Sequence, residues 1–346
     1  MTAIRKTDRL DEVDALRGLA ALSVMLYHFI YRYPAPNKPK AELIRYIFGY
    51  FPIPEFYLGL IPVYLFFMIS GFVIFMTAEK CRSIAVFGYR RFSRLYPVYW
   101  GALIVMGLTL LLFGSGQEIS PYQFFFNLTM FQEYFGVPHI SGVFWSLTVE
   151  LSFYILVAGV IGLGLMPYRK YLLLVWSLLI FFYGFYSIPN PIPWPVVHLL
   201  VLDYGHFFVY GIAVYELWKA RRSAIDKTDP FMLLLILISI ASSLIRYPAI
   251  AGIILLGVHG VFYFAVMQKL QFLRNSPMVY LGTISYALYL VHEVIGIAMM
   301  DYLALPRAAE VVATSAAALI IAMALTRWVE RPTIEWLRIN RPAWAS

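Results

Sequence analysis

Charged residues are scarce in this sequence, and cysteine is almost absent. Only 13% of the 346 residues are charged, and Cys81 is the single cysteine. One cysteine excludes an internal disulfide framework. No cleavable signal peptide is visible, because the first apolar run is long enough to stay in a membrane. Hydrophobic residues make up 61% of the chain, against about 45–50% in soluble domains. We therefore expect an all-α integral membrane protein.

The apolar residues form ten runs, which predict ten transmembrane helices. The stretch 120–136 is apolar but too short to cross, so we expect it to lie at the interface or to dip into the protein. No repeat or soluble segment interrupts the runs, and residues 1–346 are expected to form a single membrane domain. The runs are 15–31, 57–77, 98–113, 143–165, 171–188, 196–217, 230–246, 249–267, 279–301 and 308–328.

The distribution of basic residues predicts the orientation. If the N-terminus is cytoplasmic, 21 of the 27 Lys and Arg residues lie in inner segments, as the positive-inside rule requires. We therefore expect a multi-pass protein of the plasma (inner) membrane with both termini in the cytoplasm. Because the basic residues flank the spans, the net charge of +8 indicates contact with the lipid bilayer rather than with nucleic acid.

Arg17 and His28 lie eleven residues apart on the first run. Eleven residues are about three helical turns, so the two side chains point the same way, roughly 16 Å apart. A charge within the hydrocarbon costs about 2.5–3.5 kcal/mol even on insertion scales, which makes such residues functional candidates. The pair predicts a site that crosses much of the membrane.

Helical rise places five ionisable residues at one depth near the outer surface: His28, Glu150, Asp203, His292 and Glu293. Unpaired, they would be costly, so some of them should meet. We interpret His28 as a catalytic base and Glu150 as the carboxylate that orients it. His292 has two open interpretations, an acceptor-binding residue or a structural one. Polar contacts between helices are the interpretation favoured for Asp203, Glu293, His198, His206 and His259.

A basic cluster precedes the third run. Arg90, Arg91 and Arg94 suit phosphate contacts, and with Arg17 they are candidates for binding a nucleotide-bearing cofactor. The alternative is that they only fix topology or meet anionic lipids. The distance from Arg17 to His28 is about the reach of a pantetheine arm.

Three small or aromatic residues complete the candidate site. Ser70 in FFMISGFVIF is read mainly as a packing residue that also lines an acyl channel. Trp145 and Ser146 open the fourth run, and Trp145 is read as an interface anchor and a cavity wall on the substrate side. No metal site is expected.

Six stretches, in order, resemble the membrane-bound acyltransferase-3 family. Arg17 and His28 match its first-helix Arg-x10-His spacing, and Arg91 and Arg94 match its Arg-x-x-Arg element. The stretches are LDEVDALRGLAALSVMLYHF, FFMISGFVI, RRFSRLYP, NLTMF with FWSLTVELSFYIL, LGTISYALYLVH and RWVERP.

The resemblance implies a ten-helix fold and O-acylation, commonly O-acetylation, of carbohydrates or other hydroxyl-bearing molecules. We expect the acceptor to be an extracytoplasmic glycan or glycan precursor, with peptidoglycan, a macrolide or another secreted small molecule as alternatives. Acyl-coenzyme A, most often acetyl-coenzyme A, would be the donor, and Arg17, His28, Arg91 and Arg94 would be functional. Many members carry a fused SGNH hydrolase-like domain. The present sequence has none, so we expect the membrane domain or a separate partner to complete the transfer.

Two questions remain open at the level of sequence. The acyl group passes either directly to the acceptor or through an acyl-histidine intermediate. A rival hypothesis is a proton-coupled transporter of a small polar solute or a lipid-linked sugar, because membrane His and Glu residues also relay protons. The lack of internal repeats disfavours it. The oligomeric state is not predicted.

Overall fold

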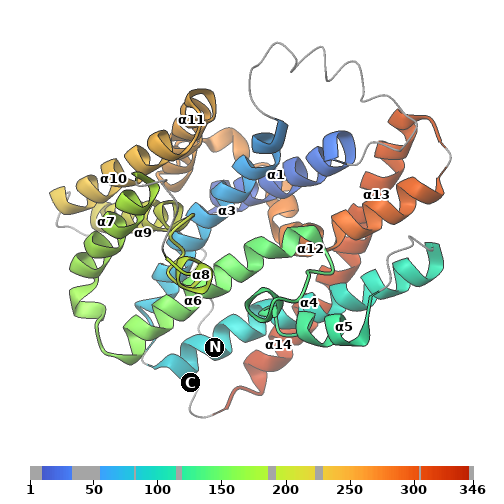
Figure 1. The fold of residues 1–346 in the computed structure, drawn as a ribbon, viewed down its shortest axis with the longest axis horizontal. Coiled ribbons are helices and arrows are strands. Elements are labelled where there is room, and N and C mark those ends of the chain that lie inside the picture. The colour runs from blue at the N-terminus through green and yellow to red at the C-terminus, as the bar shows by residue number, and fades with distance from the viewer. Residues whose placement is uncertain are drawn as a thin grey trace.

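The computed structural model describes residues 10–32, 55–81, 83–113, 119–185, 192–222, 229–303 and 305–342. Every regular element within these ranges is helical (Figure 1). The α-helices are α1 (Asp11–Tyr27), α3 (Glu55–Ala78), α4 (Ile84–Phe113), α5 (Pro121–Asn127), α6 (Trp145–Gly162), α7 (Arg169–Phe185), α8 (Trp194–Leu199), α9 (Gly205–Arg222), α10 (Pro230–Arg246), α11 (Ala249–Val266), α12 (Ser276–Tyr302), α13 (Arg307–Leu325) and α14 (Arg331–Ile339).

Short turns of other helix types join or extend these helices. Two are π-helical, η1 (His28–Arg32) at the end of α1 and η6 (Thr326–Glu330) between α13 and α14. π-helical turns are rare and are often found at functional sites. The 3-10 turns are η2 (Gln132–Phe135), η3 (Gly142–Phe144), η4 (Met166–Tyr168) and η5 (Gln271–Leu273).

Eight helical segments are long and apolar enough to cross a membrane, which confirms the predicted all-α membrane fold. They are Asp11–Arg32, Tyr57–Ala78, Ile84–Phe113, Gly142–Gly162, Met166–Phe185, Ala249–Val266, Ser276–Met300 and Arg307–Ile339. Two more helices coincide with predicted spans. α10 is apolar but has only 17 residues, and α9 ends on the charged segment 216–222.

The interior helices pack with their backbones close together, and glycine makes this possible. A Cβ on Gly282 of α12 would lie 2.1 Å from the Asp14 carbonyl oxygen of α1. A Cβ on Gly71 of α3 would lie 2.2 Å from the Phe208 carbonyl oxygen of α9. Of the eight spans, Ser276–Met300 has 78% of its most apolar window buried, whereas Met166–Phe185 has 17%. The core therefore lies around α1, α3 and α12.

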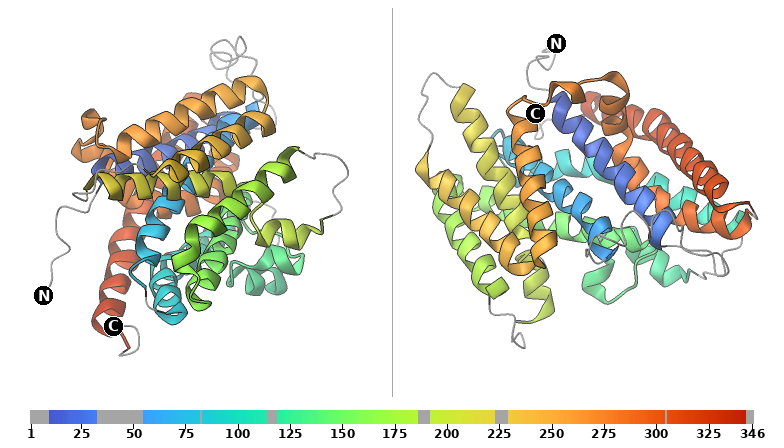
Figure 2. Two further views of the ribbon diagram at one scale, coloured as in Figure 1. Left: turned by 90° about the vertical axis from the view of Figure 1, so that its left-hand side faces the viewer. Right: turned by 90° about the horizontal axis from the view of Figure 1, so that it is seen from above.

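Outer helices enclose this core on two sides. Figure 1 shows α7, α10 and α11 gathered on one side and α13 on the other, with α1 and α3 between them. The views in Figure 2 show α1 running alongside α12. The residues that share the neighbourhood of α1, α3 and α12 come from distant parts of the sequence, and the polar residues of these three helices face each other.

Three predicted segments can be compared with the structure in detail: two differ from it, and one agrees with it. The run 196–217 is not one helix, because α8 ends at Leu199 and α9 begins at Gly205. The third span begins at Ile84 rather than residue 98, since the basic cluster is itself helical. The stretch 120–136 holds only the seven-residue α5 and a 3-10 turn, as expected of a segment too short to cross.

Basic residues of α4, α7 and α9 gather at one end of the bundle, here called the basic end. Glu79, which follows α3, pairs with Lys219 near the end of α9 (2.6 Å) and with Arg169 at the start of α7 (3.6 Å). Arg90 at the start of α4 donates to the Cys81 sulfur (3.6 Å). The ends of α3 and α9 thus lie beside the starts of α4 and α7.

An ion-pair cluster ties α8 to the turn η2. Glu133 lies 3.4 Å from His198 Nε2 and 3.5 Å from His139 Nε2. Burial raises the pKa of the Glu133 carboxyl, but the two imidazoles lower it more, to about 2. The carboxylate is therefore ionised and holds the two segments together near neutral pH.

Candidate active site

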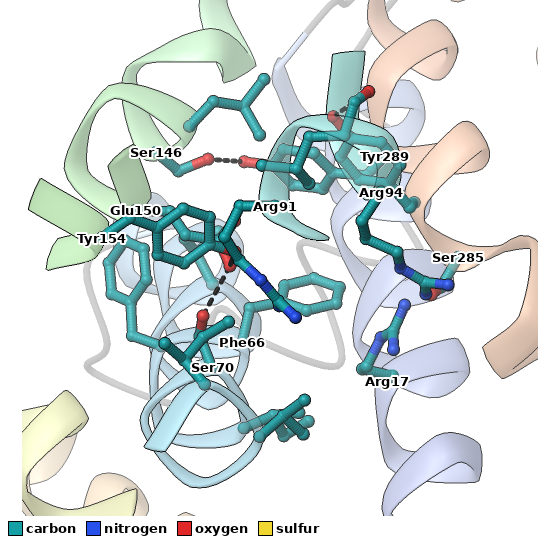
Figure 3. A pocket seen from close by; sticks show the side chains of 18 residues that line it. Arg17, Phe66, Ser70, Arg91, Arg94, Ser146, Glu150, Tyr154, Ser285 and Tyr289 are labelled. Carbon is teal, nitrogen blue, oxygen red and sulfur yellow. Dashed lines mark hydrogen bonds between the residues drawn. The ribbon is translucent and has the colours of Figure 1, made fainter. Parts of the chain in front are cut away.

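A basic cavity of about 130 Å³ opens between α1, α3, α4, α6 and α12. Arg17 of α1 and Arg91 and Arg94 of α4 line it. Arg91 and Arg94 share a helix face, as their i, i+3 spacing predicts. Figure 3 shows the three guanidinium groups directed into the same space. Three fixed cations in one small cavity form a site for an anion with several negative charges.

The three arginines keep unused donor capacity. Buried Arg91 Nε has no hydrogen-bond partner among the described residues. The Arg91 guanidinium instead lies over the rings of Phe87 (5.8 Å) and Tyr154 (6.0 Å). Arg94 lies 3.5 Å from Glu330 of the π-helical turn η6. Such free N–H groups are what a phosphate requires.

Arg90 differs from its neighbours. It is outside the lining of the basic cavity and donates to Cys81. The structure therefore brings together three of the four arginines that were predicted to bind the cofactor, and separates the fourth.

Glu150 belongs to the basic cavity. Its Oε1 accepts from the Ser70 hydroxyl (2.5 Å) and from the Tyr154 hydroxyl (2.7 Å), and all three residues line that cavity. Ser70 is thus both a packing residue and part of the cavity wall. The predicted pairing of Glu150 with His28 is absent from the described contacts, since His28 lines a different cavity.

A second cavity of about 620 Å³, here called the His28 cavity, lies between α1, α3, η3, α6 and α10. His28, Glu293 and Trp145 line it together with several tyrosines. Val63 and Tyr289 line both cavities and therefore form the partition between them. The Tyr289 hydroxyl is held by Ser146 Oγ at 2.6 Å (Figure 3).

The hydrogen bonds of His28 fix its tautomer. Its Nδ1 lies 2.9 Å from the Val24 carbonyl oxygen, and a carbonyl only accepts, so Nδ1 carries hydrogen. His292 Nδ1 likewise donates to the Leu288 carbonyl (3.1 Å), which leaves His292 Nε2 as an acceptor, 3.2 Å from His28 Nδ1. In neutral His28 the lone pair is therefore on Nε2. His292 lines neither cavity and contacts His28 on the Nδ1 side of its ring.

Glu293 is the carboxylate beside His28. Its Oε1 lies 4.0 Å from His28 Nε2, and the Glu293 side chain is only 6% exposed. Its Oε2 accepts from Ser141 Oγ (2.5 Å) and from the Val143 backbone N–H (3.1 Å), in the turn that leads into α6. A carboxylate at the start of a helix is in a favourable field. The anion is held in place, close to where a proton would arrive on Nε2.

His28 therefore lies beside Glu293 and not beside Glu150, the partner that the sequence pattern predicted. Glu293 had been assigned to polar packing between helices. The available signal was its position directly after His292 at the level of His28. Asp203 lines the His28 cavity, whereas Glu150 lines the basic cavity. Trp145 lines the former and Ser146 the latter, which separates two predicted substrate contacts by one partition.

Comparison with known proteins agrees with this architecture. The family model described as an acyltransferase domain, the acyltransferase-3 domain, matches residues 10–327, which is most of the chain. The protein belongs to the membrane-bound acyltransferase-3 family. It is a multi-pass membrane enzyme that transfers acyl groups, as the six motifs predicted. No solved structure matches the chain significantly.

Relatives of this acyltransferase-3 protein are distant. ORF330 of Acidianus two-tailed virus, which carries a provisional acetyltransferase name, is 24% identical over 80% of each chain. The acyltransferase MdmB of Streptomyces mycarofaciens is 27% identical over 42% of this chain and 38% of its own. The peptidoglycan O-acetyltransferase OatA of Listeria monocytogenes is 26% identical over 42% of this chain and 23% of its own. This chain therefore aligns with less than half of the last two.

Proposed function

We propose that this protein is an O-acyltransferase that carries an acyl group, most often acetyl, from cytoplasmic acyl-coenzyme A to a hydroxyl of an extracytoplasmic glycan or glycan precursor. The observation that carries the proposal is the pair of cavities that share Val63 and Tyr289. One cavity has three arginines, and the other has a histidine whose Nδ1 donates to a backbone carbonyl, so that its lone pair is on Nε2.

The orientation follows from the basic end. Under the positive-inside rule, this end faces the cytoplasm of the plasma membrane. With α9 and α10 counted as spans, the chain crosses ten times and both termini are cytoplasmic. The basic cavity then opens toward the cytoplasm, where acyl-coenzyme A is found, and Arg17, Arg91 and Arg94 bind its phosphates. The pantetheine arm extends past Ser70 and Ser146 to the partition at Tyr289.

The acceptor enters the His28 cavity. His28 Nε2 removes the hydroxyl proton while the oxygen attacks the thioester carbonyl. The carbon–sulfur bond then breaks, and the imidazolium returns the proton to the leaving thiolate. Imidazole suits both steps because its ordinary pKa of about 6.5 lies near working pH. Glu293 stabilises the imidazolium, and the Val24 carbonyl and His292 hold its tautomer. Glu150 instead accepts hydrogen bonds in the basic cavity.

The test compares two histidines that share one backbone contact. His259 Nδ1 donates to the Leu255 carbonyl four residues earlier, as His28 Nδ1 does to Val24, but His259 lines neither cavity. In purified protein without any ion gradient, we expect His28→Gln to abolish transfer of radiolabelled acetyl from acetyl-coenzyme A, and His259→Gln to retain it. Equal activity in both variants would remove His28 from catalysis. A strict requirement for a proton gradient would favour the transporter.

A further inference from the structure

The His28 cavity contains a second polar centre, formed by Asp203 and Arg246. Arg246 Nη1 donates to Asp203 Oδ1 at 2.9 Å, and both residues line the cavity. The Asp203 side chain is 35% exposed and that of Arg246 16% exposed, so part of each remains open to a ligand. No step proposed for the acyl transfer uses this pair.

Arg246 is fixed from several directions. Its guanidinium lies over the Tyr183 ring at 5.1 Å, and its Nη2 donates to the Leu202 carbonyl at 3.3 Å. Gly184 leaves room for it, because a Cβ there would lie 2.9 Å from Nη2. Buried Arg246 Nε has no hydrogen-bond partner among the described residues. Such a preorganised guanidinium loses little entropy when it binds a ligand.

The backbone that presents Asp203 is strained. Val201 has φ 52°, although it is β-branched and only 2% exposed. A β-branched residue in the left-handed region is an outlier, and such strain tends to be retained at functional positions. This turn interrupts the run 196–217 and brings Asp203 and Tyr204 to the cavity wall.

Tyrosine rings surround the pair. The Tyr247 ring lies 5.3 Å from that of Tyr64 and 6.0 Å from that of Tyr57, and Tyr204 lies 6.0 Å from Tyr64. All four line the His28 cavity, but Tyr64 is only 2% exposed and stacks on Phe207 at 4.5 Å. The ring faces open to a ligand therefore come from the half-buried Tyr57, Tyr204 and Tyr247. Ring faces with hydroxyl tips suit a ligand that has both an apolar face and polar edges. The acidic and basic side chains in the lining, Asp203, Glu293, Arg32 and Arg246, balance in charge.

We propose that Asp203 and Arg246 form the acceptor-recognition site, which binds adjacent hydroxyls of an uncharged sugar ring stacked on the tyrosines. A carboxylate accepts from one hydroxyl, and the guanidinium donates to the oxygen of the next. Balanced charge favours a neutral ring over an acidic one. This proposal rests on the proposed function and assigns specificity, rather than catalysis, to the pair.

The experiment measures acceptor kinetics in nanodiscs without glycoside detergents. The probes are methyl glucoside, methyl galactoside and methyl rhamnoside, with methyl glucuronide as the acidic ring and glycerol as the acyclic diol. For the wild type we expect kcat/KM for at least one neutral glycoside to exceed that for glycerol and for the uronide at least tenfold. If glycerol or the uronide is the better acceptor, or no ring is acylated, the assignment is wrong.

The variants separate recognition from folding. Asp203→Asn, Arg246→Lys and Gly184→Ala should each raise KM for the glycoside at least tenfold, whereas the Kd for coenzyme A, which binds in the other cavity, should stay that of the wild type. Glu133→Gln, which breaks an ion pair outside both cavities, is the matched control and should leave KM unchanged. An unchanged KM in folded Asp203→Asn and Arg246→Lys would reduce the pair to a structural link. Failure of the wild type to release coenzyme A or to transfer acetyl at all would instead refute the proposed function.

Discussion

The substitution Glu293→Gln separates the two carboxylates that compete for the role of charge partner to His28. Glutamine keeps the shape of the side chain, and its amide oxygen still accepts from Ser141 and the Val143 N–H. The negative charge is lost, and an NH2 donor replaces Oε1, the oxygen nearest to His28 Nε2. In the proposed reaction this charge matters most once His28 Nε2 has taken the proton, so the loss should appear in kcat rather than in substrate binding.

The expected magnitude follows from the distance. Two unit charges 4.0 Å apart, as between His28 Nε2 and Glu293 Oε1, interact by about 4 kcal/mol at an effective dielectric constant of about 20. At about 1.36 kcal/mol for each tenfold change in rate, this sets an upper limit near a thousandfold. Water in the His28 cavity weakens the interaction. We therefore expect kcat to fall roughly a hundredfold or more, with little change in KM for acetyl-coenzyme A.

The assay is steady-state acetyl transfer by Glu293→Gln and Glu150→Gln side by side. A second variant, Gly142→Ala, moves the carboxylate without removing its charge, because a Cβ there would lie 2.8 Å from Glu293 Oε1. Gly159→Ala is its control, since a Cβ at Gly159 meets nothing within 4 Å. We expect Gly142→Ala to lower kcat and Gly159→Ala to preserve it. Normal kcat in Glu293→Gln combined with a large loss in Glu150→Gln would refute the pairing and restore Glu150.

Three further predictions concern the basic cavity, the ion-pair cluster at Glu133 and the helix packing. Arg91→Ala should weaken coenzyme A binding about tenfold or more, as expected for bonds to charged groups, whereas Arg90→Ala should not; titration calorimetry measures both. The low pKa of Glu133, about 2, stabilises the fold above its ordinary pKa of 4.5 and ceases to do so as pH falls toward 2. Glu133→Gln should therefore lower Tm most at pH 6, less at pH 3, and hardly at all at about pH 1.5. Gly71→Ala should destabilise by about 1–3 kcal/mol or more, and Gly107→Ala, which meets no neighbour, should not; thermal unfolding compares them.

The sequence predicted that His28, His292 and Glu293 lie at one level along their helices, because the rise of a helix is fixed per residue. These three side chains do lie close together. The direction of a side chain around the helix axis was harder to predict, since a small change in packing angle decides which neighbour it faces. Glu150 and Glu293 were both predicted near His28, and only the tertiary structure assigns them to different cavities.

The break in the sixth predicted span had only a weak sequence signal. Residues 200–204 read LVLDY, and the turn-forming residues Asp203 and Gly205 follow Val201, but they stand within an otherwise apolar run that favours a continuous helix. The ion pair between Asp203 and Arg246 joins positions 43 residues apart and arises from packing alone. By contrast, the shared helix face of Arg91 and Arg94 in α4 could be predicted, because residues three apart on a helix lie on one face. Arg90 is four residues before Arg94 and shares its side of the helix by the same rule, so its contact with Cys81 in place of the cavity could not be predicted from spacing.

The central claim is that a thioester supplied at the basic end is consumed by His28 on the far side of the partition. Proteoliposomes with one protein orientation test it directly, because acetyl-coenzyme A does not cross the bilayer. Radiolabelled acetyl-coenzyme A is supplied only on the side of the basic end, and a membrane-impermeant hydroxyl acceptor only on the other. Acetylated acceptor in the opposite compartment, lost in His28→Gln, is the predicted result. Acetylation only when donor and acceptor share one side would contradict the account.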